Sequence, residues 1–91
     1  HVVGYNCADA PTATLYLELA AVAGLASVDA LIDLLAGFVE VAPFPSCLTA
    51  AGIVADAVPG LAANAAEQWT AAFNPVAIAA ADFEDLYRAA I

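Results

Sequence analysis

Proline and glycine residues divide this chain into short segments, and their positions limit the length of any helix or strand that it can form. Prolines stand in "PFP" at 43–45, in "VPG" at 58–60 and in "NP" at 74–75, and Gly24 follows a run of alanine and leucine. Proline interrupts a helix because it lacks the amide N–H and clashes with the preceding turn, while glycine commonly ends one. The pattern predicts an all-α protein, a small bundle of four to five short helices joined by tight turns.

The clearest helical pattern is "SVDALIDLLAGFVEVA", residues 27–42. Apolar residues recur three and four positions apart, and the acids fall on the opposite face. Ser27 is placed to cap this helix, and Asp29 suits its first turn because the helix dipole favours an acid there. The predicted apolar stripe consists of Val28, Leu31, Ile32, Leu35, Phe38, Val39 and Ala42.

The segment before Gly24 is ambiguous. Residues 12–19 alternate in polarity as a strand would, but leucine, glutamate and alanine favour a helix. Only "HVVGY" at 1–5 could pair with a strand here, and two strands alone are marginally stable. We therefore predict a helix over 12–23. Because apolar residues surround most of it, we expect this helix to be buried at the centre of the bundle.

Three further helices are predicted downstream, over about residues 47–57, 60–73 and 75–90. Ser46 is placed to cap the first of them. Asn74 and Pro75 give the last one a capping residue followed by a proline at its first position, where proline is favoured. We predict one helical domain that spans residues 1–91. Its first eleven residues, 1–11, have no helical period and are expected to form an extended leader.

Cys7 and Cys47 are the only cysteines. An even number in a small, lysine-free chain suggests a disulfide and an oxidising compartment. Such a bridge would tie the leader to the start of the helix at 47–57, and chain entropy alone would make it worth about 4 kcal/mol. We therefore predict one disulfide and a secreted protein, with two buried free thiols as the alternative.

Hydrophobic residues make up 65% of the sequence, well above the roughly 45–50% of ordinary domains. A chain of 91 residues has a large surface for its volume, so it cannot bury every large apolar side chain. Some apolar surface should therefore meet a ligand, another subunit or an interface.

The formal net charge is −9. Nucleic acids and anionic membranes are unsuitable partners, because both are bound mainly through Lys and Arg. The longest uncharged stretch is "VAPFPSCLTAAGIVA", residues 41–55, and it contains two prolines. A spanning helix needs roughly 20 predominantly apolar residues, so no transmembrane segment is predicted.

No constellation of residues indicates catalysis. His1 is the only histidine and no lysine is present, which removes the common general bases. Asp29 and Asp33 lie one turn apart on a face expected to meet solvent, and Glu84 has the spacing of a helical ion pair with Arg88. Calcium-loop and phosphate-loop motifs are absent. We predict no enzyme activity, no cofactor and no metal site.

The remaining candidates are aromatic side chains on or beside the apolar stripes. Core packing is the ordinary explanation for them, but they are also suited to line an apolar cavity or an interface. The predicted ligand-binding residues are Tyr16, Phe38, Phe44, Trp69, Phe73, Phe83 and Tyr87. The leading hypothesis is a secreted, non-enzymatic protein that holds a lipid or another hydrophobic small molecule between its helices. The alternative is an effector- or toxin-type interaction protein whose apolar surface forms a homodimer, a larger oligomer or a partner interface.

Overall fold

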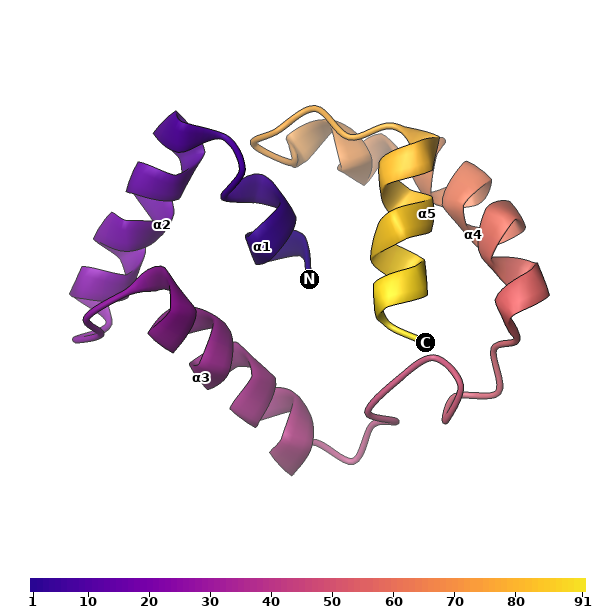
Figure 1. Cartoon of the computed structure of the whole chain (residues 1–91), viewed down its shortest axis with the longest axis horizontal. Coiled ribbons are helices and arrows are strands. Elements are labelled where there is room, and N and C mark those ends of the chain that lie inside the picture. The colour runs from indigo at the N-terminus through magenta and orange to yellow at the C-terminus, as the bar shows by residue number, and fades with distance from the viewer. The chain divides into compact units, whose positions relative to one another are not determined.

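A computed structural model describes residues 1–91 and contains five α-helices, two 3-10 helices and no strand (Figure 1). The predicted all-α class and the helical choice for residues 12–19 are therefore confirmed. The chain divides into two compact units. We call Val2–Phe44 the N-terminal unit, and Pro45–Ile91 together with His1 the C-terminal unit.

The N-terminal unit contains α1 (Val2–Asn6), α2 (Ala10–Val22) and α3 (Val28–Val41). The extended leader predicted for residues 1–11 is wrong, because α1 is helical and packs against α2. Asn6 at the end of α1 is fully buried, and its Nδ2 donates a hydrogen bond to the Tyr16 hydroxyl at 3.0 Å. This tertiary contact stabilises α1, and the local sequence of so short a helix does not predict it.

A side-chain cap sets the start of α2. Asp9 has an extended backbone, and its Oδ2 accepts hydrogen bonds from the Thr12 amide at 3.0 Å and from the Thr12 hydroxyl at 2.6 Å. The helix therefore begins at Ala10, two residues before the predicted start. It ends as predicted, because Gly24 has a φ of +75°, which glycine adopts without steric cost.

The Asp9 cap predicts a specific pH dependence. The hydrogen bonds from Thr12, the side-chain bond first, hold the pKa of the Asp9 carboxyl below its ordinary value of 3.8. A depressed folded-state pKa stabilises the protein above the unfolded pKa, and that stabilisation is lost as the pH falls through the folded pKa. Asp9→Ala should therefore melt below the wild type at neutral pH, and the difference should disappear in the acid range below 3.8. Thermal unfolding of both proteins down to about pH 2 measures the difference in melting temperature. A difference that stays constant with pH would contradict a lowered pKa for Asp9.

Local signals also define α3. The Ser27 Oγ accepts a hydrogen bond from the Ala30 amide at 3.1 Å, so the predicted cap is present. The helix ends at Val41, just before the "PFP" segment at 43–45. Leu31, in its N-terminal half, is buried at 6% exposure, and α2 packs against α3.

The C-terminal unit contains η1 (Ala55–Ala57), α4 (Val58–Ala66), η2 (Trp69–Phe73) and α5 (Ala80–Ala89). The helix predicted over 47–57 is wrong: residues 45–54 form turns, and only η1 is helical. The Leu48 amide donates instead to the distant Ala90 carbonyl at 2.8 Å. Gly52, with a φ of +85°, turns the chain immediately afterwards. A long-range hydrogen bond and a left-handed glycine thus replace the local helix.

The last two predicted helices are shorter than expected. The segment predicted over 60–73 is divided into α4 and η2, which are separated by Glu67 and Gln68. The segment predicted over 75–90 becomes helical only at Ala80. Asn74 does not cap it; its Nδ2 donates to the Val76 carbonyl at 2.7 Å, which forms a local turn. In Figure 1, α4 lies beside α5, and these two helices form the main packing contact of the unit.

The structure does not support the predicted disulfide, because Cys7 and Cys47 are both half-buried free thiols in it. Cys7 follows α1 in the N-terminal unit, whereas Cys47 lies in the turns of the C-terminal unit. The Cys47 sulfur accepts a hydrogen bond from the Ala50 amide at 3.5 Å.

None of the helices is long and apolar enough to span a membrane.

Candidate functional site

The exposed apolar surface is the most unusual feature of this molecule. The buried apolar residues are only Ala20, Leu31, Val58 and Ala62. Fifteen large apolar side chains are exposed, and four of them, Val54, Trp69, Phe73 and Ile91, belong to the C-terminal unit, which leaves eleven in the N-terminal unit. Single exposed apolar residues are normal in proteins, but concentrations of them mark interaction sites. The candidate site is therefore in the N-terminal unit.

One concentration lies along α2. Leu15, Leu19 and Val22 are 60%, 53% and 87% exposed, and their spacing places them on one side of the helix. We call these three residues the α2 stripe. Glu18 borders it, being three residues after Leu15 and four before Val22.

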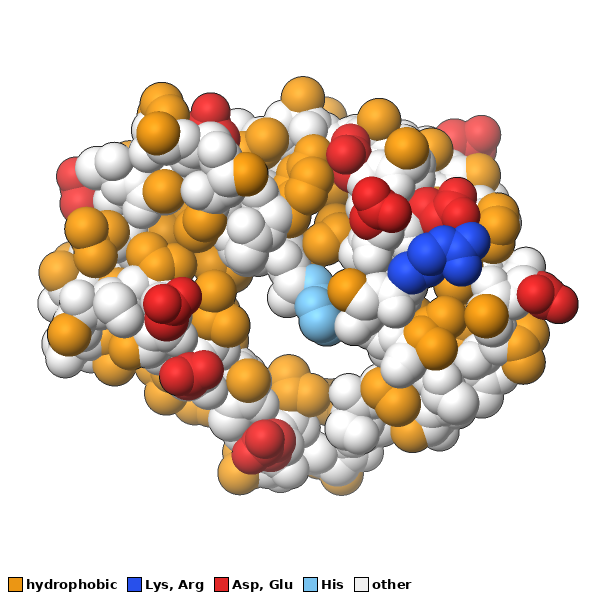
Figure 2. Space-filling view, in the orientation of Figure 1, with side chains coloured by type: hydrophobic (Ala, Val, Ile, Leu, Met, Phe, Trp, Pro, Cys, Tyr) orange, Lys and Arg blue, Asp and Glu red, His pale blue; other side chains and the backbone are white.

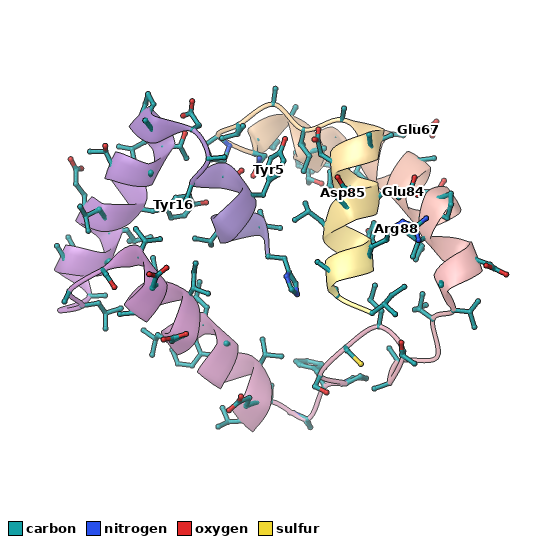
Figure 3. The ribbon with its side chains drawn as sticks, viewed as in Figure 1. Tyr5, Tyr16, Glu67, Glu84, Asp85 and Arg88 are labelled. Carbon is teal, nitrogen blue, oxygen red and sulfur yellow. The ribbon has the colours of Figure 1, made fainter.

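The prediction that α2 is a central, buried helix is wrong. Only Thr12 and Ala20 are buried in it, and Tyr16 is half-buried. Thr12, Tyr16 and Ala20 recur every fourth residue, so they share one side of the helix. Figure 3 shows Tyr16 on α2 and Tyr5 on α1, within the same unit. The neighbouring helices thus cover one side of α2, and its other apolar residues stay in solvent.

A second concentration covers the C-terminal half of α3. It consists of Leu34, Leu35, Phe38, Val39 and Val41, which we call the α3 face. Their spacings of three and four residues give one continuous apolar side, and exposure reaches 58% at Phe38 and 84% at Val41. The first half of α3 is different, because Leu31 is buried there. The stripe predicted for residues 27–42 is thus partly core and partly surface.

The seven predicted aromatic residues are divided between the two units. Tyr16, Phe38 and Phe44 belong to the N-terminal unit, and Trp69, Phe73, Phe83 and Tyr87 belong to the C-terminal unit. Phe38, Phe44, Trp69 and Phe73 are exposed, whereas Tyr16, Phe83 and Tyr87 are half-buried. Among them the structure pairs the rings of Trp69 and Phe73, whose centroids are 5.4 Å apart in an edge-to-face arrangement.

Sequence reasoning missed the aliphatic members of the site. Leu15, Leu19 and Val22 on α2 and Leu34 and Val41 on α3 are absent from the aromatic candidates, although all five are exposed. The sequence of α2 did indicate that some of its apolar residues would stay exposed, because it carries apolar residues on every side. A helix of 13 residues in so short a chain has too few neighbours to cover all of its sides.

The two units differ in charge, because only the C-terminal unit contains basic side chains. Arg88 is in the C-terminal unit, where its Nη2 lies 2.6 Å from the Glu84 carboxylate. This confirms the predicted helical ion pair, which Figure 3 shows on α5. The N-terminal unit contains Asp9, Glu18, Asp29, Asp33 and Glu40 but no Lys, Arg or His. In the space-filling view, the blue of Arg88 is on α5, and the visible face of α3 carries red acids beside orange apolar groups (Figure 2).

The acidic and thiol side chains do not converge on a metal-binding geometry, since no three of them, or of these with His1, are grouped as ligands. The exposed apolar side chains of α2 and α3 are suited to non-covalent association.

No protein-family model, no curated protein and no solved structure matches this chain.

Proposed function

We propose that this is a non-enzymatic binding protein that associates with a partner chain through the α2 stripe and the α3 face. The observation that carries the proposal is the exposure of eleven large apolar side chains in a unit of 43 residues, Val2–Phe44. Burying a leucine side chain completely is worth about 1.5–3 kcal/mol. A partner that covers several half-exposed leucines and valines would therefore gain substantial binding energy without any change in the fold.

A partner chain suits these residues better than a small molecule does. Sites for small molecules are concave and enclose most of the ligand. Val22 and Val41, by contrast, are 87% and 84% exposed at the ends of their helices. Side chains presented in this way are suited to another helix or subunit, which can extend along an exposed helix face.

A hydrophobic small molecule, such as a lipid, is the second candidate. It is favoured by the sequence of α2, "APTATLYLELAAV", which has a single charged residue, Glu18. A helix that is apolar on most sides is usually surrounded by apolar material. We also propose that the protein is secreted. The predicted disulfide no longer supports this proposal, because Cys7 and Cys47 are free thiols.

The test compares polar variants of exposed residues. Leu15→Gln with Leu19→Gln should lower the binding of an apolar dye at least several-fold, and it should abolish any self-association seen by light scattering. The melting temperature should hardly change, because surface substitutions usually alter stability by less than about 0.5 kcal/mol. Val54→Gln with Phe73→Gln is the matched control in the C-terminal unit, where these side chains are 65% and 73% exposed.

Native mass spectrometry of the wild type identifies what is bound. A heterologous chain or a second copy supports the partner interface, whereas a bound lipid that survives purification supports the second candidate. Equal dye binding by the wild type and by the α2 variant would show that the α2 stripe is not the binding surface.

A further inference from the structure

We infer that the partner of the N-terminal unit is a cationic amphipathic helix, one with leucine-like residues on one side and Lys or Arg along its edges. This inference rests on the proposed function and adds the chemical class of the partner. It follows from combining the exposed apolar residues of α2 and α3 with the charges carried by the same helices.

The N-terminal unit carries only negatively charged side chains. Five acids and no base lie within Val2–Phe44. Glu18 borders the α2 stripe, and Asp33 and Glu40 occupy the side of α3 opposite the α3 face. All three side chains are exposed, and no ion pair is formed by any of them, since the sole ion pair joins Arg88 to Glu84. On α2, an unneutralised acid therefore borders exposed apolar residues, and the acids of α3 add negative charge to the same unit.

This negative charge disfavours a second copy of the chain and an anionic lipid surface as partners. A second copy docked through the α2 stripe would bring Glu18 near its own counterpart, with no base in either N-terminal unit. Like charges placed together across an interface are costly and suppress such partners. An anionic lipid surface is disfavoured for the same reason.

A cationic amphipathic helix complements the α2 stripe in both shape and charge. An amphipathic helix binds by placing apolar residues at i, i+3, i+4 and i+7 against an apolar surface, and Leu15, Leu19 and Val22 have that same spacing. Long Lys and Arg side chains can lie along apolar surface and still carry their charge to an acid at its edge. Such a helix would cover the α2 stripe and pair with Glu18, which has no base of its own.

The experiment uses two designed peptides of identical pattern, one of leucine and lysine and the other of leucine and glutamate, titrated against the full chain by calorimetry. We expect the Leu/Lys peptide to bind and the Leu/Glu peptide to bind at least roughly tenfold more weakly, a difference set by charge alone. Raising the salt concentration should weaken the Leu/Lys complex, because salt screens exposed charges, but should leave an apolar component.

Charge variants place the interaction on one unit. Glu18→Gln, Asp33→Asn and Glu40→Gln together remove three acids from the N-terminal unit, and Asp56→Asn, Glu67→Gln and Asp85→Asn remove three exposed acids from the C-terminal unit. Both triple variants have the same net charge. We expect the first to weaken Leu/Lys binding roughly tenfold and the second by less than about threefold.

Equal weakening by both triple variants would mean that the peptide associates with a polyanion, and the inference would be overturned. Equal binding of both peptides would also overturn it, while leaving the proposed apolar binding surface intact. If neither peptide binds but the dye still reports the α2 stripe, only the partner class fails. If the dye fails as well, the proposed function fails with it.

Discussion

A Val58→Asp variant is expected to unfold the C-terminal unit, whereas Val54→Asp should keep its structure. Val58 is 0% exposed, and Val54, four residues earlier, is 65% exposed. An unpaired carboxylate at a buried position costs several kcal/mol, which is comparable to the roughly 5–15 kcal/mol that stabilises a whole protein. An acid at the first position of α4 would interact favourably with the helix dipole, but that contribution is only about 0.3–1 kcal/mol. The burial cost therefore decides the outcome.

The two variants carry the same chemical change, so their comparison separates burial from charge. Circular dichroism measures the loss of helix, and amide hydrogen exchange resolved by segment shows whether the loss occurs in α4 and α5. A Val58→Asp protein with wild-type protection in α4 would show that this position is not a core position in solution. Equal damage by both variants would instead indicate that added negative charge destabilises the chain.

Elements fixed by neighbouring residues were predicted well. The Ser27 cap, the periodic stripe of α3 and the proline segment after it are all local, and the observed helix Val28–Val41 matches the prediction within one residue at each end. The positive φ of Gly24 likewise needs no tertiary information. Helices with a cap, a period and a stop signal are the ones a sequence specifies without outside contacts.

Elements fixed by distant residues were not predicted. The turn at 45–54 depends on the hydrogen bond from the Leu48 amide to the Ala90 carbonyl, across a separation that no local pattern encodes. Helix α1 depends on the burial of Asn6 against Tyr16. In both places tertiary contacts override the local preference, which is a weak prior for short segments.

The sequence predicted that apolar surface would be exposed, but it did not predict which residues would form it. Composition alone indicated that apolar surface would be left over, and fifteen exposed large apolar side chains bear that out. Which side chains remain exposed depends on how few helices surround α2, and periodicity does not report that. The emphasis on aromatic residues therefore missed Leu15 and Leu19, while it included Tyr16, which instead bonds to Asn6.

An Ala20→Leu variant should destabilise the N-terminal unit by about 1–3 kcal/mol, the usual cost of forcing extra methylene groups into a packed position. Ala20 is 0% exposed, and its carbonyl accepts the hydrogen bond from the Leu25 amide at 2.9 Å that completes the turn after α2. A larger side chain must displace the helices packed against α2, because no empty volume is available at full burial. For a chain of this size, each kcal/mol lowers the melting temperature by roughly 4–8 °C.

Ala21→Leu is the matched control, since Ala21 is the next residue of the same helix and is exposed. Leucine and alanine are both good helix formers, so the control should melt near the wild type, while its added apolar surface should increase dye binding. Thermal unfolding followed by circular dichroism compares the three proteins. If Ala20→Leu melts at or above the wild type, α2 is not packed on its Ala20 side. The apolar surface of the N-terminal unit would then extend around the whole helix instead of ending at the α2 stripe.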